Sequence, residues 1–175
     1  MMLESLEIII EFGLGLAGFA GIIVALAGDP ASWAHQERVR VFGLIFSALL
    51  ACFASLLCIA LGKYYPEQFS ARVASGLFFL LGLYFFPRQV YRTFYIFRND
   101  KDNYSQRVTA VFMVLTVMIL SVSLMAALNL FFQPFSLFYS AMVLTLLFAA
   151  ITYVRILLYR PAGSLTKIKK RNEQA

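Results

Sequence analysis

Residues that commonly build catalytic and metal sites are scarce in this chain. Its 175 residues include a single histidine, His35, which lies beside Glu37 in a short polar loop. One histidine there supplies neither a Ser–His pair within a membrane nor a metal site of several histidines. No segment has a strand pattern, so no glycine-rich phosphate loop follows a strand. The sequence therefore predicts no enzymatic activity, no metal site and no cofactor.

Cysteine is also scarce, and its two copies fall in one apolar run. Cys52 and Cys58 are six residues apart, a spacing that turns a helix by about 600° and points the two thiols to different faces. The two thiols therefore cannot form a disulfide with each other. We interpret both as small apolar side chains that fill space between helices.

Charged residues are few, whereas hydrophobic residues are in large excess. Only 14% of the chain is charged and 61% is hydrophobic, against about 25% and about 45–50% in ordinary soluble domains. A soluble protein of 19.7 kDa has a core too small to hide that much apolar surface. The chain is therefore predicted to be an all-α integral membrane protein, with the lipid bilayer as its first partner.

Five apolar runs have about the length of a transmembrane helix, which needs roughly 20 residues. They cover about residues 6–27, 41–61, 70–86, 108–131 and 135–158. The third is the shortest because Pro87 and Arg88 interrupt it. We expect a single helical transmembrane domain over residues 1–159, a cytoplasmic helical extension over about 88–98, and a basic cytoplasmic tail over 160–175.

The distribution of Lys and Arg predicts the orientation of these spans. Of the 15 Lys and Arg residues, two lie between the first and second runs, five between the third and fourth, and six at or beyond the end of the fifth. Only Lys63 and Arg72 fall on the other side. Because cytoplasmic loops accumulate basic residues, we expect the N-terminus outside and the C-terminus in the cytoplasm. Glu4 stands where a signal peptide would carry a basic residue, so we expect the first run to be retained as a span.

The first span carries carboxylates, which are costly within a bilayer and often mark function. Glu7 and Glu11 are four residues apart and share a helix face with Gly15 and Gly18. If several copies bring this face to a common axis, it forms an acidic external entrance to a pore that attracts cations. A structural ion pair is the other open interpretation, because Lys63 and Arg72 lie at the same membrane level.

Small residues in the same span and hydroxyl groups in the fourth span form two further patterns. Gly13, Ala17, Gly21 and Ala25 recur at every fourth position, the small-xxx-small pattern of closely packed membrane helices. In the fourth span, Thr116 and Ser123 belong to a mildly polar stripe. That stripe predicts either an ion path or hydrogen bonds between helices.

Basic residues gather at the cytoplasmic ends of the third and fifth spans. The candidates for binding lipid headgroups are Arg88, Arg92, Arg98, Arg155 and Arg160. The general excess of basic residues in cytoplasmic loops explains the same pattern. Because these residues cluster at helix ends and in the tail, the net charge of +6 does not indicate nucleic-acid binding.

The stretch GFAGIIVALAG at residues 18–28 is followed by a short loop with Trp33, Glu37 and Arg38. This combination resembles the opening of uncharacterised small bacterial multi-pass inner-membrane proteins. The resemblance covers about a quarter of the chain. It implies a location in the bacterial inner (plasma) membrane and carries no activity with it.

Three functional hypotheses follow from these patterns. The first is a homo-oligomeric membrane channel or pore, permeable to cations, because five helices leave little room for a pathway within one chain. The second is a membrane-embedded accessory or effector subunit that binds a protein partner at its basic cytoplasmic face. The third is a proton-coupled transporter of a small solute, in which Glu7 or Glu11 would carry the proton.

Overall fold

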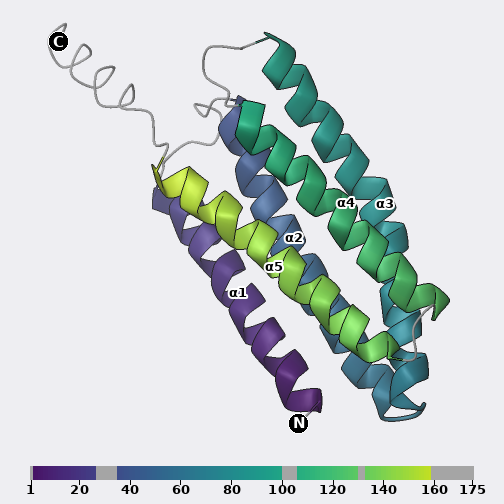
Figure 1. The fold of residues 1–175 in the computed structure, drawn as a ribbon. Helices are drawn as coiled ribbons and strands as arrows, with labels where there is room; N and C mark the ends of the chain where they lie inside the picture. The colour runs from purple at the N-terminus through teal and green to yellow at the C-terminus, as the bar shows by residue number, and fades with distance from the viewer. Residues whose placement is uncertain (1, 27–34, 100–105, 130–132, 159–175) are drawn as a thin grey trace, which may run out of the picture.

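A computed structural model describes residues 2–26, 35–99, 106–129 and 133–158, and the regular secondary structure in these ranges is entirely helical. The helices are α1 (Met2–Leu26), α2 (His35–Gly62), α3 (Glu67–Asn99), α4 (Gln106–Leu128) and α5 (Pro134–Leu158) (Figure 1). All 5 contain a stretch long and apolar enough to cross a membrane. The predicted all-helical class with five helices of spanning length is confirmed, and it fits a multi-pass transmembrane protein.

The third helix is much longer than its apolar run. α3 has 33 residues and is therefore about 50 Å long, whereas a hydrocarbon core measures about 30 Å. The helix continues through Pro87 without a break, so the segment over 88–98 is the last part of α3 and not a separate element. Figure 1 shows this part of α3 projecting beyond the ends of its neighbours. The tail over 160–175 lies outside the described residues.

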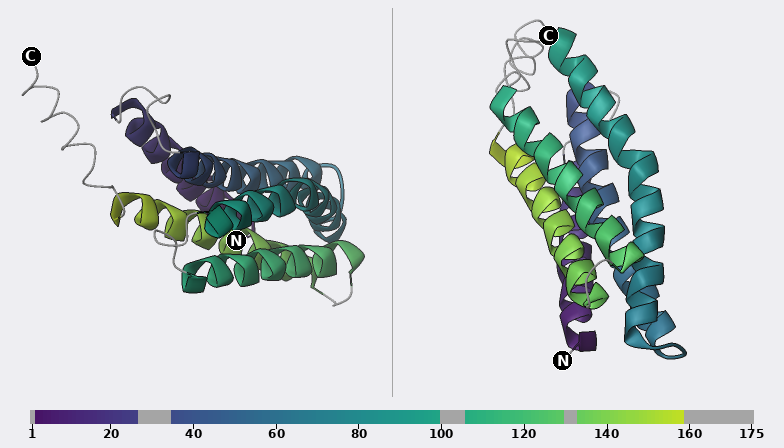
Figure 2. Two further views of the ribbon diagram at one scale, coloured as in Figure 1. Left: turned by 90° about the horizontal axis from the view of Figure 1, so that it is seen from above. Right: turned by 45° about the vertical axis from the view of Figure 1, so that its right-hand side comes forward.

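The helices form two rows, with α1, α2 and α3 in one and α4 and α5 in the other (Figure 2). α5 contacts all four other helices, whereas α1 packs mainly on α2 and α5. Half of the α2 span is buried, against 22% of the α1 and α4 spans. α2 and α5 therefore form the centre of the bundle, and α1 lies at its edge.

Small side chains of α2 and α5 are buried at the centre of the bundle. Ala48 and Ala51 on α2, and Ala141 and Ala149 on α5, are fully buried in one apolar cluster. Small residues at such contacts are typical of helix packing in membranes, where backbone approach and van der Waals contact replace the hydrophobic effect. The centre of the chain is therefore tightly packed.

Buried hydroxyl groups in this core bond to the helix on which they lie. Thr145 Oγ1 donates to the Ala141 carbonyl at 2.7 Å, and Ser75 Oγ donates to the Ala71 carbonyl at 2.7 Å. Such bonds to the preceding turn satisfy the hydroxyl without a partner on another helix. These hydrogen bonds do not join different helices, so packing holds the helices together.

Three phenylalanine rings join α3, α4 and α5. The Phe148 ring meets the Phe112 ring at 4.9 Å between centroids and the Phe86 ring at 6.1 Å, both edge to face. Phe86 and Phe148 are buried. This edge-to-face arrangement is the favoured geometry of aromatic pairs, so the cluster locks these three helices at the end of the bundle away from the N-terminus.

The N-terminus and two helix connections share the opposite end of the bundle (Figure 1). Between α2 and α3, the amides of Tyr64 and Tyr65 donate to the Leu61 carbonyl at 3.0 and 2.9 Å. α4 ends at Leu128, and the next residue, Asn129, has a φ of 54°, the left-handed conformation that commonly closes a helix. We call this the N-terminal end of the bundle.

Candidate functional site

The acidic face of α1 points away from the bundle. Glu7, Glu11, Gly15 and Gly18 are all exposed in the single chain. A Cβ atom placed on Gly15 or Gly18 would meet no atom of a neighbouring element within 4 Å. The four predicted pore residues of α1 therefore lie together on one open helix face.

The opposite face of α1 packs into the bundle through larger side chains. Leu6, Ile9, Leu16 and Ala20 are buried at the spacing of one helix face. The sequence does not distinguish this face, because nearly every position of the run is apolar, on the exposed side as well as the buried side. The bundle therefore fixes which way the carboxylates of α1 point.

Gly13 lies at a tight contact between α1 and α2. A Cβ atom at this position would lie 2.5 Å from Cys52 Sγ and 3.2 Å from the Ala48 carbonyl oxygen. The Cys52 thiol also lies 3.5 Å from the Ile10 carbonyl. A side chain at this position would require Cys52 Sγ to move, and the Ala48 carbonyl leaves little room beside it.

The small-residue pattern that begins at Gly13 is only partly used in one chain. Ala17 is half-buried, whereas Gly21 and Ala25 are exposed. A Cβ atom on Gly21 would meet nothing within 4 Å. The second half of the pattern therefore remains open on the surface of α1.

Large apolar side chains surround the two carboxylates. Ile8, Phe12 and Phe19 on α1 are each more than half exposed. Within the described residues, no ion pair joins Glu7 or Glu11 to Lys63 or Arg72. The carboxylates thus stand within an apolar surface and are not neutralised by those two cations.

The two hydroxyl groups predicted for an ion path on the fourth helix do not lie beside the acidic face of α1. Thr116 and Ser123 on α4 are buried, and they donate to the Phe112 and Leu120 carbonyls at 2.8 and 3.0 Å. α4 packs mainly against α3 and α5. In a single chain these hydroxyl groups therefore point into the bundle and do not join the acidic face of α1.

One of the predicted headgroup-binding arginines has a defined environment. Arg88 is exposed, and its Cζ lies 4.0 Å from the centroid of the Tyr84 ring, a favourable cation–π contact. The side chains of Arg92, Arg98 and Arg155, and all of Arg160, lie outside the described residues. Of the five arginines predicted to bind headgroups, the structure therefore describes the side chain of Arg88 only.

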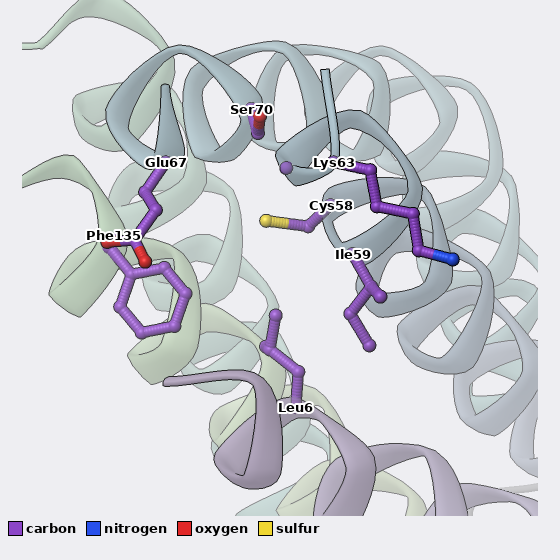
Figure 3. A pocket seen from close by; sticks show the side chains of 8 residues that line it. Leu6, Cys58, Ile59, Lys63, Glu67, Ser70 and Phe135 are labelled. Atoms are coloured by element: carbon purple, nitrogen blue, oxygen red, sulfur yellow. The ribbon is translucent and has the colours of Figure 1, made fainter. Parts of the chain in front are cut away.

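A cavity of about 240 Å³ opens at the N-terminal end of the bundle (Figure 3). It is lined by residues of α1, α2, α3, α5 and the α2–α3 turn: Leu6, Cys58, Ile59, Gly62, Lys63, Glu67, Ser70 and Phe135. No local sequence pattern could have revealed it, because the lining comes from distant parts of the chain. In the ranges that the structure describes, no group of three or more His, Cys, Asp or Glu residues gathers to hold a metal ion.

The chain matches no protein-family model, and neither curated proteins nor solved structures show significant similarity to it. The outward acidic face of α1, the cavity at the N-terminal end and the projecting end of α3 are the features that distinguish the described surface of this chain.

Proposed function

We propose that the chain is the subunit of a homo-oligomeric, cation-permeable channel in the bacterial inner membrane. In this assembly the N-terminus lies outside, and the acidic face of α1 lines the external entrance. The observation that carries the proposal is the exposure of Glu7 and Glu11 on an apolar helix, without an ion pair to Lys63 or Arg72 among the described residues.

Carboxylates on such a surface need water or polar partners, because charge is poorly solvated by lipid. A ring of α1 helices around an aqueous axis would supply that water and concentrate cations. Gly15 and Gly18 leave the helix surface open directly below Glu11, so neighbouring copies can approach closely. Glu11 lies about 6 Å further along the helix than Glu7, which makes it the more deeply placed charge.

The packing of the single chain favours a pathway between copies over a pathway within one copy. Core hydroxyl groups such as those of Thr116 and Thr145 bond to their own helix. Among the described buried side chains, Ser55 Oγ is the one polar atom without a hydrogen-bond partner. This packing supports a pathway along a surface shared by several subunits over a pathway through the described core.

Glu11→Gln tests this proposal in reconstituted bilayers. We expect the cation conductance to fall by roughly tenfold at low salt, because focused charge raises the local cation concentration by about that factor or more. The loss should shrink at high salt, where the charge is screened. Single-channel recording over a series of salt concentrations measures both effects.

Glu67→Gln is the matched control, since Glu67 is an exposed carboxylate near the same end of the bundle but lies on α3. It should leave the cation preference unchanged. Equal conductance and ion selectivity of the wild type and Glu11→Gln would show that Glu11 does not line the ion path. A monomeric protein without flux would overturn the channel itself.

A second candidate function is that of an accessory subunit which binds a cytoplasmic protein. The projecting end of α3, where Arg88 and Tyr91 are exposed, favours it, because a rigid helix beyond the bundle offers a docking surface. Removing residues 160–175 should then abolish recovery of the partner while ion flux stays unchanged. Affinity purification from native membranes with the full and shortened chains checks this. Undiminished recovery would contradict a role for the tail.

A further inference from the structure

The cavity at the N-terminal end has an apolar interior. Leu6, Ile59 and Phe135 line it from three different helices, and the Cys58 side chain points into it (Figure 3). Its volume of about 240 Å³ exceeds the ~150 Å³ of an apolar cavity known to admit benzene. An apolar part of a ligand, such as the beginning of an acyl chain, therefore fits inside.

The cavity is bordered by one positive and one negative side chain. Lys63 and Glu67 both line it and are both exposed, and Figure 3 shows their side chains extending in different directions. Within the described part of the chain they form no ion pair with each other. Both charges are therefore available to a ligand that carries an anion and a cation together.

Aromatic residues beside the cavity indicate its depth in the membrane. Tyr64 and Tyr65 follow Lys63 in the α2–α3 turn and are 84% and 53% exposed. Tyrosine gathers at the level of lipid headgroups, where its ring is apolar and its hydroxyl is wet. The charged border of the cavity is thereby placed beside headgroups, and its interior beside the upper acyl chains.

We propose that this cavity binds a zwitterionic phospholipid with a primary ammonium group. The phosphate lies at Lys63, the ammonium group lies at Glu67, and the first part of an acyl chain enters between Leu6, Ile59 and Phe135. The site acts within one chain, so it does not depend on the proposed channel. Loss of the lipid site would leave the channel intact, and loss of the channel would leave the lipid site intact.

Cys58 provides a reporter inside the site. In the full chain carrying Cys52→Ala, Cys58 is the only thiol, and its alkylation by N-ethylmaleimide measures access to the cavity. We expect alkylation in phosphatidylglycerol nanodiscs to slow by about fivefold when half of the lipid is phosphatidylethanolamine, because partly exposed ion pairs give effects of about this size. Free phosphoethanolamine in solution should not slow the reaction, which would identify the membrane lipid as the ligand.

The matched control carries Cys58→Ala and keeps Cys52. Both thiols are buried in the single chain, but only Cys58 lines the cavity, whereas Cys52 lies between α1 and α2. Its alkylation should be slow and independent of the headgroup. Glu67→Gln should remove most of the headgroup-dependent protection of Cys58, whereas Lys63→Gln should weaken the retention of both lipids, because both carry the phosphate. Native mass spectrometry adds a second measurement, in which we expect one phosphatidylethanolamine retained per wild-type chain and less in either variant.

Two results would overturn the proposal. One is a Cys58 alkylation rate that is the same in both lipid mixtures, whether fast or as slow as that of Cys52. The other is equal retention of phosphatidylglycerol and phosphatidylethanolamine by the wild type and by both charge variants. Either result would show that the headgroup is not recognised by Lys63 and Glu67.

Discussion

Gly13→Leu is expected to separate α1 from the rest of the bundle. Even the first atom of a side chain would lie 2.5 Å from Cys52 Sγ and 3.2 Å from the Ala48 carbonyl oxygen, and Leu146 Cδ2 closes the space at 3.4 Å. Overpacking of this kind costs about 1–3 kcal/mol and occasionally more. Thermal unfolding in mild detergent should shift to lower temperature, and proteolysis should release α1 first.

Gly21→Leu is the control for this experiment. Gly21 lies on the same helix, and a Cβ atom there would meet nothing within 4 Å, so its stability should stay near that of the wild type. Gly13→Ala tests the contact more directly. It should lose stability, and adding Cys52→Ala should recover much of that loss, because it removes the Sγ atom that lies nearest to the new Cβ. Equal stability of Gly13→Leu and Gly21→Leu would contradict the described packing of α1 on α2.

Phe148→Ala is expected to cause the other large loss of stability. The Phe148 ring contacts Phe86 on α3 and Phe112 on α4, so its removal leaves a void between three helices. Phe→Ala in a protein core costs about 3–5 kcal/mol. We expect about 3 kcal/mol, the lower end of that range, because the unfolded chain also stays in lipid and the loss is mainly one of packing.

The neighbouring residue supplies the control for Phe148. Leu147 is 47% exposed, so Leu147→Ala removes side-chain atoms from the surface and leaves the ring cluster intact. Equilibrium unfolding in mixed micelles compares the two variants. If both variants lose the same stability, the three rings do not form the contact described here.

The helices themselves could be predicted from composition and run length. The predicted runs and the apolar stretches of the structure agree within a few residues at most ends; the second, for example, was expected at 41–61 and is Val41–Gly62. Such agreement is expected, because a bilayer admits only segments that are long, apolar and internally hydrogen-bonded. The helical extension after Pro87 also carried a local signal, since aromatic and basic residues follow one another there.

Contacts between helices were much harder to predict. The recurrence of small residues indicated a packing face on α1, yet only Gly13 is fully buried on it, whereas Gly21 and Ala25 are exposed. The face that packs combines Gly13 with larger side chains such as Leu6 and Ile9. Nearly every position of an apolar membrane helix is hydrophobic, so hydrophobicity alone does not separate the face toward protein from the face toward lipid.

The candidate sites also differ in how far the sequence could predict them. Glu7 and Glu11 stand out in any reading of the sequence, because charge within an apolar run is rare. The direction in which they point depends on how α1 docks on α2 and α5, and this becomes visible only in the folded chain. The cavity at the N-terminal end draws its lining from across the chain, so it had no sequence signal at all.

The position of α1 in the assembled protein tests the proposed channel most directly. Single-particle imaging of the full chain in lipid nanodiscs would give both the number of subunits and the location of each helix. The proposal predicts a closed ring in which α1 surrounds the symmetry axis and Glu11 faces it. A monomer, or a ring in which α1 lies on the lipid-facing perimeter, would contradict it.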